Sequence, residues 1–416
     1  MSPAALSLAA LLVALVISMT SSINVGWLAI AFAWLIGVYS AGLRPDAVMA
    51  GFPATLFLTL VGVTLLFAIA ETNGTIEALS LRATRLARRS VRTLPVVLFA
   101  VACALSSVGP GAVSTVALLM PFAMAAGTRT GLPPLLVALM VANGANAGNL
   151  SPFSSVGVIA NGAMAKAGLV GFAGRVWFAN FAAHLIVAFA AFVWLARRVA
   201  PIAPAASEQG DDTTALSRQH LMTLGMIGLW MIGVLAFQLN LGLSAVAAAI
   251  LLLLARAADE STAVKRMPWG IIMMVCGVSL LIGVLERTGG MDLFTDLMAR
   301  IASAETLNGV IAFITGSIST YSSTSGVVLP AFLPTVSTLV NKVGGGDPLA
   351  VALSINVGSS LVDVSPLSTI GALCVAAVTD SVAGRRLFRA LLIWGLSMTI
   401  VGAILCQLFA PMLARW

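Results

Sequence analysis

The sequence predicts an all-α polytopic membrane protein made of two inverted repeats, each with five transmembrane helices, one of them broken, and a re-entrant helical hairpin. Of the 416 residues 60% are hydrophobic and 9% are charged, with a mean hydropathy of +1.05, whereas soluble domains carry about 25% charged residues. The segment SPFSSVG (151–157) recurs as SPLSTIG (365–371), each inside an apolar run. Each half has five predicted crossings. Because five is an odd number, the second half is predicted to lie inverted in the membrane relative to the first.

Apolar runs locate the elements, at about 20 residues per spanning helix. The first half is predicted to span at 5–20, 26–43, 52–70, 134–165 (broken) and 174–199. The second half is predicted to span at 219–237, 242–257, 269–286, 348–378 (broken) and 387–411. Two further apolar stretches, 94–127 and 306–341, have Ser/Gly/Pro-rich centres at 106–115 and 317–325, and we predict that each is a hairpin.

The halves also match in order, which predicts the domain organisation. GVTLLFAIAETNG (62–74) pairs with GVSLLIGVLERTG (277–289). Ser114-Thr115 and Pro121 of the first hairpin pair with Ser323-Thr324 and Pro330 of the second. We therefore predict a first repeat over 1–199, a cytoplasmic linker over 200–218 and a second repeat over 219–416.

Charge orients the chain in the membrane. Loops 71–93, 128–133, 197–218, 256–268 and 379–386, with the adjoining helix ends, hold 15 of the 22 Lys and Arg residues. Positive loops face the cytoplasm, so both termini are predicted to lie outside. The formal charge of +7 does not indicate a nucleic-acid partner, because the basic residues sit at helix ends and form no patch interleaved with aromatic residues.

Two smaller features complete the organisation. Residues 75–89 place Arg82, Arg85 and Arg89 on one helical face, which suits a helix at the membrane surface. No disulfide, metal cluster or cofactor is expected, because the four cysteines fall in apolar runs without metal-ligand spacing. They are Cys103, Cys276, Cys374 and Cys406.

The two helix breaks predict where ligands bind. A broken helix exposes amide groups that attract anions and carbonyl groups that coordinate cations. No Lys or Arg is predicted deep in the membrane, so a bound carboxylate would depend on helix dipoles, hydroxyls and amides. The predicted substrate-binding residues are Ser106, Ser107, Ser114, Thr115, Asn146, Ser154, Ser322, Ser323, Thr324, Ser368 and Thr369. The predicted cation-binding residues are Asn143, Asn149, Ser151, Asn356, Ser359, Asp363 and Ser365.

Asp363 is the strongest single candidate for a functional residue. Aligning the two Ser-Pro pairs places it opposite Asn149, so only one half has an ionisable group there. A carboxylate at this depth is costly and indicates function, either as a Na⁺ ligand or as a proton carrier. The alternative is a structural acceptor that caps the half-helix starting near Ser365. His184, in an apolar run without partners, is interpreted as a packed or interfacial side chain.

A family resemblance rests on these residues. The order of hairpin, broken helix and inverted copy resembles the ion transporter superfamily, including the divalent anion/sodium symporters. FPATLFLTLVGVTLLFAIAETNGTIEAL (52–79) and LVALMVANGANAGNLSPFSSVGVIANG (136–162) are similar to the malonate/dicarboxylate carriers of the MatC type. The close similarity covers roughly residues 20–165.

The resemblance implies an elevator-type transporter in the bacterial cytoplasmic membrane, commonly a homodimer. It implies that the hairpins and the helix breaks together bind a small dicarboxylate and its coupling cations. Na⁺ is favoured over H⁺ as the coupling ion, with sites near Asn149 and Asp363. The chain departs from the symporter pattern at the Ser-Asn-Thr tips, which read Gly111-Ala112-Val113 and Thr320-Tyr321-Ser322. The Thr-Pro-Pro-Asn breaks of that family are Ser-Pro-Phe-Ser and Ser-Pro-Leu-Ser here. Substrate identity is therefore not carried across.

The leading hypothesis is cation-coupled symport of malonate or C4-dicarboxylates. One alternative is an efflux carrier or antiporter for organic or inorganic anions of the same superfamily. An alternative of another class is an anion channel with re-entrant hairpins. An enzyme is not predicted, because the chain has no HExxH or GxSxG signature and its two histidines lack a paired nucleophile.

Overall fold

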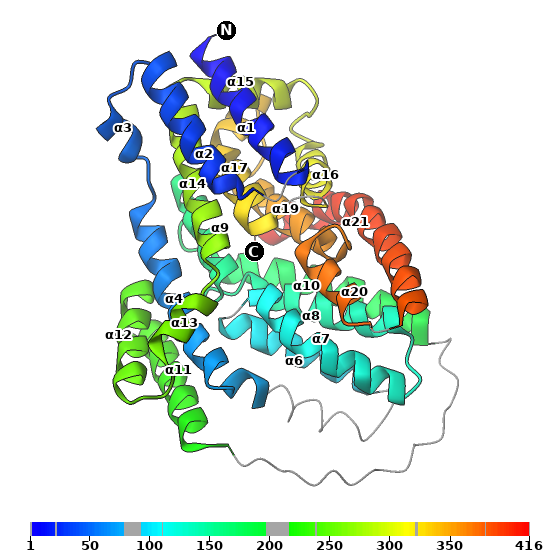
Figure 1. Ribbon diagram of the computed structural model, residues 1–416. Helices are drawn as coiled ribbons and strands as arrows, with labels where there is room; N and C mark the ends of the chain where they lie inside the picture. The colour runs from blue at the N-terminus through cyan, green and yellow to red at the C-terminus, as the bar shows by residue number, and fades with distance from the viewer. Residues whose placement is uncertain are drawn as a thin grey trace.

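The chain is helical throughout the part that the structure describes. This computed structural model describes residues 2–20, 23–78, 93–109, 111–196, 216–237, 239–320, 323–378 and 380–415, and these contain helices and no strand (Figure 1). The predicted all-α class is confirmed. Most of the predicted surface helix at 75–89 and of the linker at 200–218 lies outside the described residues.

Seven helical segments within the described ranges are long and apolar enough to cross a membrane. They are Ala54–Thr72, Gly111–Thr128, Ala173–Leu195, Trp269–Arg287, Thr324–Val343, Pro348–Ala376 and Val382–Arg415. Five shorter apolar helices accompany them. The chain is therefore a multi-pass membrane protein.

The first half consists of four helices, a hairpin, a broken helix and a final long helix. Its elements are α1 (Pro3–Thr20), α2 (Val25–Trp34) continued by the π-helix η1 (Leu35–Ser40), α3 (Pro45–Met49), α4 (Ala54–Thr72), α6 (Leu94–Val108), α7 (Gly111–Arg129), α8 (Pro134–Asn149), α9 (Ser155–Lys166) and α10 (Ala173–Ala196).

The second half has the same order with one extra described helix, α15, before its hairpin. Its elements are α11 (Arg218–Phe237), α12 (Leu241–Leu254), α13 (Glu260–Arg266), α14 (Trp269–Arg287), α15 (Gly290–Ala299), α16 (Leu307–Ser319), η2 (Thr324–Val328), α17 (Leu329–Phe332), η3 (Leu333–Thr335), α18 (Val336–Val343), α19 (Pro348–Leu361), η4 (Val362–Val364), α20 (Thr369–Ala376) and α21 (Ser381–Arg415).

Both predicted hairpins are present, but the turn of the first is shorter than its Ser/Gly/Pro-rich centre. Most of the Ser/Gly/Pro-rich centre at 106–115 is helical, because α6 continues to Val108 and α7 begins at Gly111. Gly109, with φ +156°, lies in the turn between them. Ser106, Ser107, Ser114 and Thr115 are therefore helical; packing of both arms against α8 outweighs the weak helix preference of serine.

Each half packs a long helix against a short helix of the other half. The α14 helix contacts α2, and α4 contacts α12; Figure 1 shows both pairs side by side. A Cβ on Gly277 would lie 2.2 Å from the carbonyl oxygen of Gly26, and a Cβ on Gly62 would lie 2.2 Å from that of Gly242. Gly62 and Gly277 begin the two segments that the sequence comparison paired. Small residues allow this close backbone approach in membranes.

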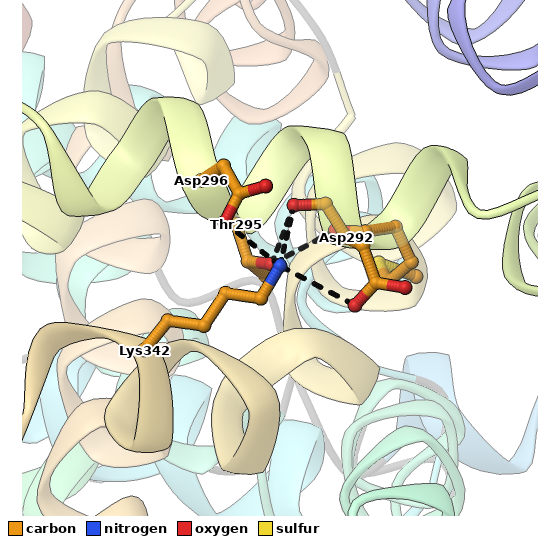
Figure 2. A network of polar contacts seen from close by, with 5 residues as sticks. Asp292, Thr295, Asp296 and Lys342 are labelled. Atoms are coloured by element: carbon orange, nitrogen blue, oxygen red, sulfur yellow. Dashed lines mark hydrogen bonds and ion pairs between the residues drawn. The ribbon is translucent and has the colours of Figure 1, made fainter.

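An ion-pair cluster ties the second hairpin to α15. Lys342, at the end of α18, lies 2.9 Å from an Asp296 carboxylate oxygen and 3.3 Å from an Asp292 carboxylate oxygen (Figure 2). Its Nζ also donates to the Asp292 carbonyl at 2.8 Å. Both carboxylates are largely exposed, so the cluster contributes about 0–1 kcal/mol per pair and mainly fixes position.

Replacing Gly277 with alanine tests the close helix crossing. The added methyl group overlaps the Gly26 carbonyl, so Gly277→Ala is expected to destabilise the protein by about 1–3 kcal/mol. Gly225→Ala in α11, where nothing lies within 4 Å, is the control and should be neutral or slightly stabilising. Thermal unfolding of the purified variants measures both, and equal melting temperatures would contradict the crossing.

Candidate functional site

The two SPxSxxG motifs form the same local structure. In each, the main chain leaves the helix at the first Ser, and the fourth residue, Ser154 or Ser368, precedes the next half-helix. The Ser154 hydroxyl donates to the Asn149 carbonyl, and the Ser368 hydroxyl donates to the Asp363 carbonyl. Proline at the second position lacks an amide proton and disfavours helix for the preceding residue. The predicted breaks are therefore present in both halves.

The glycine that ends each motif is required by close packing. A Cβ on Gly157 would lie 1.8 Å from the Ser151 carbonyl oxygen, and one on Gly371 would lie 2.1 Å from that of Ser365. The second half-helix thus folds back onto the first serine of its motif. The spacing of Ser, Pro, Ser and Gly in the recurring segment follows from this turn.

The first break lies against the tip of the first hairpin. The Asn149 side-chain oxygen accepts a hydrogen bond from the Ala112 backbone amide at 2.9 Å. The hydroxyls of Ser106 and Thr115, on either side of this tip, are fully buried and have no hydrogen-bond partner among the described residues. Buried polar atoms rarely stay unpaired, so this cluster of oxygen atoms indicates a ligand site.

The second break lies against the tip of the second hairpin, with a carboxylate in place of the amide. The Asp363 carboxyl group is buried, and its neighbours are the hydroxyls of Ser319 and Thr324, which flank that tip. Those two hydroxyls also bond to each other, and Thr324 lies 3.3 Å from the Ser359 carbonyl oxygen. The donor set is entirely oxygen, which suits a hard cation.

The structural alternative for Asp363 is wrong. The half-helix after the break begins at Thr369, and its N-cap position is occupied by Ser368. Asp363 lies instead in the 3₁₀ turn η4, with its side chain on the hairpin tip. It therefore links the break to the hairpin and caps no helix.

The interpretation of His184 as a packed side chain is confirmed, but the structure gives it two polar partners that the sequence did not reveal. His184 is fully buried in α10, with Nδ1 3.0 Å from the Asn143 side-chain oxygen and Nε2 3.3 Å from the Ser360 hydroxyl. One turn earlier, Asn180 donates to the Asn146 carbonyl at 2.6 Å and accepts from Ser360 at 2.6 Å. These two α10 side chains bridge α8 and α19, the first halves of both broken helices. Their spacing of four residues in an apolar helix was the available sequence signal.

The other predicted site residues divide between the two breaks and the rest of the molecule. Asn146 is fully buried with both side-chain atoms unpaired among the described residues, as is the Asn356 oxygen. Ser151 and Ser365 accept amide hydrogen bonds within their own turns, and Ser323 is the N-cap of η2. Ser107 and Ser114 are half-buried in the first hairpin, Ser359 is buried in α19, and Thr369 is exposed. Ser322 lies outside the described residues.

The two breaks lie close together. The α8 helix contacts α19, η4 and α20, so both motifs meet in one region of the bundle. Figure 1 shows α20 and α21 of the second half beside α7, α8 and α10 of the first. Lys166, the exposed last residue of α9, lies beside a small cavity that Val275 and Ser279 of α14 also line.

Comparisons with known proteins indicate a membrane transporter. The predicted resemblance to MatC-type carriers is confirmed over the N-terminal region, because residues 1–149 match the family model for the N-terminus of the dicarboxylate carrier protein MatC. A search of curated proteins found no match.

Among solved structures, the crystal structure of the YdaH transporter of Alcanivorax borkumensis is similar to this chain. The TM-score is 0.61 at 15% sequence identity, and the match covers 88% of this chain and 89% of that one. At this identity the similarity concerns the fold, which the two chains share over most of their length.

Removing the His184 side chain tests the α10 bridge. His184→Leu leaves the Asn143 side-chain oxygen without its imidazole partner in a buried site, which costs about 1–3 kcal/mol, whereas Ser360 keeps its bond to Asn180. Thermal unfolding should show this loss, whereas His220→Gln, at a half-buried contact with the Asn73 carbonyl, should change little. Comparable effects of the two changes would argue against the bridge.

Proposed function

We propose that the protein is a secondary active transporter that imports a small dicarboxylate, malonate or a C4 acid, together with a cation. Na⁺ is favoured over H⁺ as the coupling ion. The observation that carries this proposal is the matched pair of oxygen clusters, one at each break, where Asn149 contacts the first hairpin tip and Asp363 contacts the second. Two such sites on either side of an anion let cations offset substrate charge.

The all-oxygen donor sets support Na⁺. Around Asp363 the carboxylate, the Ser319 and Thr324 hydroxyls and the Ser359 carbonyl are available. Around Asn149 the side-chain oxygen and the unpaired Ser106 and Thr115 hydroxyls are available. The proposed Na⁺ residues would therefore be Asn149 and Asp363 with these neighbours.

The substrate class is supported by the match of residues 1–149 to the MatC N-terminus and by the amide ends of α9 and α20. Ser154 and Ser368 precede these half-helices, whose N-termini carry partial positive charge and suit carboxylates. The unpaired Asn146 side chain adds a donor near the first break.

We further propose that the halves are inverted repeats and that the hairpins and broken helices move as a unit against a scaffold, as in elevator transporters. The paired contacts of α14 with α2 and of α4 with α12 support the repeat. A bacterial cytoplasmic membrane location, both termini outside and a homodimer complete the proposal. Orientation rests on the charge of the loops, and the dimer rests on the family resemblance alone.

A thermal-shift screen of the purified protein tests the function. Mono-, di- and tricarboxylates are added with NaCl or choline chloride at equal ionic strength, and stabilisation is expected only with a dicarboxylate and Na⁺ together. At a ligand concentration about 100 times Kd the gain is about 2.7 kcal/mol. Equal stabilisation in choline would rule out Na⁺ coupling, and stabilisation by none of the anions would rule out the substrate class.

Vesicle transport separates the alternatives. Accumulation of the dicarboxylate against its gradient, driven by Na⁺, would exclude the channel. Movement only outward, or only in exchange for another anion, would favour the efflux carrier or antiporter.

Replacing Asp363 with asparagine tests its role in coupling. The change keeps the shape but removes the charge that would hold a cation, so Na⁺-driven accumulation in proteoliposomes should fall about tenfold or more. Asp292→Asn on the exposed face of α15 is the control and should keep normal uptake. Concentrative uptake at the wild-type level in Asp363→Asn would refute the coupling role.

A further inference from the structure

An apolar cavity lies between α10, α19 and α21, three helices that contact one another in the bundle. Its volume is about 130 Å³, close to the roughly 150 Å³ of an apolar cavity that binds benzene. The lining side chains are aliphatic, aromatic or methionine, apart from Cys406, whose thiol contacts the Ser354 carbonyl. None of the predicted site residues is among them, so the cavity needs an explanation of its own.

The cavity is a groove that opens at the surface of the bundle. Its floor includes Leu353 and Val357 of α19, which are buried. Its rim includes Ile186 of α10, which is 50% exposed, and Met412 of α21, which is 64% exposed. Both rim helices are candidate membrane spans, so the medium outside this apolar rim is lipid.

The groove has the length of one membrane leaflet. The candidate span Ala173–Leu195 has 23 residues and is about 35 Å long, against a hydrocarbon core of about 30 Å, so its start lies at the level of the lipid headgroups. Ile186, the lining residue farthest along α10, follows Arg175 by 11 residues, or about 16 Å. The groove therefore runs from the headgroup level to about the middle of the bilayer.

Arg175 lies at the headgroup end of the groove. It precedes Ala179, the first lining residue of α10, by one turn. Its Nη1 donates to the Ala414 carbonyl at 3.0 Å, next to the last lining residue, Leu413, and its guanidinium carbon is 5.4 Å from the centre of the Phe172 ring. These contacts hold the guanidinium group in place. One hydrogen bond uses only one of its five N–H donors.

The surroundings of this end favour an anion. The first amide groups of α10, at 173–175, have no partner within the helix, and a helix N-terminus attracts negative charge. A Cβ on Gly174 would have nothing within 4 Å, so there is open space beside these amides. Arg415, which follows Ala414, is exposed and adds a second positive charge. The ion pairs found in the described ranges include neither arginine.

We propose that this groove binds an anionic phospholipid, with one acyl chain along the groove and the phosphate at Arg175 and the N-terminus of α10. The apolar lining suits a hydrocarbon chain, and a guanidinium group pairs strongly with phosphate oxygens. The proposal is independent of the proposed function, because it uses neither the helix breaks nor the hairpin tips.

A second copy of the chain fits this face less well than a lipid does. Two copies with the same orientation in the membrane are related by a two-fold axis along the membrane normal, so equivalent residues lie at the same depth. Docking through the groove would therefore bring Arg175 and Arg415 of both copies to the same level, where like charges repel. The same arginines attract an anionic headgroup.

A lipid in the groove contacts the helices that join the two breaks. Ala179 and Ala183 line the groove, and they are the sequence neighbours of Asn180 and His184, whose side chains bridge α8 and α19. Bound lipid therefore stabilises this part of the folded chain, and a ligand that binds the folded state raises the melting temperature.

Native mass spectrometry and thermal unfolding of the purified full chain in detergent test the groove. The probes are phosphatidylglycerol, phosphatidylcholine with the same acyl chains, and glycerol phosphate, which has the headgroup charge without the chains. One phosphatidylglycerol per chain is expected to stay bound and to raise the melting temperature, and phosphatidylcholine should bind about tenfold more weakly. Equal affinity for the two lipids, or equal stabilisation by glycerol phosphate, would overturn the proposal.

Substitutions locate the bound lipid. Arg175→Gln should weaken phosphatidylglycerol binding about tenfold, and Arg175→Lys, which keeps the charge, should restore most of the affinity. Ala182→Leu fills the groove from its half-buried edge and should abolish retention of both lipids. The matched controls are Ala190→Leu, exposed on α10 outside the groove, and Arg386→Gln, exposed at the other end of α21. Both should bind phosphatidylglycerol like the wild type.

The remaining outcomes are equally decisive. Wild-type retention of phosphatidylglycerol in both Arg175→Gln and Ala182→Leu would overturn the proposal. Conversion of a wild-type dimer into monomers by Ala182→Leu, with lipid binding unchanged, would show that the groove is a contact between copies and would also overturn it. If Ala182→Leu does not fold, the comparison of the two lipids on the wild type and on Arg175→Gln decides alone.

Discussion

The site depends on one constraint: main chain that leaves a helix inside a membrane must still satisfy its polar groups. At both breaks, hydrogen bonds within the turn itself satisfy main-chain polar groups. Ser154 and Ser368 bond back to the carbonyls of Asn149 and Asp363, and a glycine lets the next half-helix pack onto the turn. Because the turn supplies its own hydrogen bonds, the side chains of Asn149 and Asp363 are left to face the hairpins.

The two halves share this backbone solution but differ in charge. The first break presents an amide that already binds the Ala112 amide proton, and the second presents a carboxylate beside the hydroxyls of Ser319 and Thr324. Identical geometry with one ionisable member makes the two clusters unequal in affinity for any cation, because a buried carboxylate contributes a full charge. If the proposed cation sites exist, the Asp363 cluster would therefore bind a cation more favourably than the Asn149 cluster.

Much of this architecture could be predicted from the sequence, because proline and glycine act locally. The recurring SPxSxxG segment predicted both breaks, and the apolar runs predicted the order of helices. The turn of the first hairpin is shorter than the Ser/Gly/Pro-rich segment at its centre, because Ser106 and Ser107 remain helical against α8. The partners of His184 could not be predicted, because Asn143 and Ser360 are 41 and 176 residues away in the chain.

The bridge made by Asn180 and His184 has a consequence for how ligands act on the chain. Hydrogen bonds join α10 to both α8 and α19. A movement of one broken helix would therefore be coupled to a movement of the other. Binding energy gained at either cluster is then distributed over both. Ion binding would in that case be cooperative, with a Hill coefficient above one, and loosening the bridge would lower that coefficient before it weakened either site.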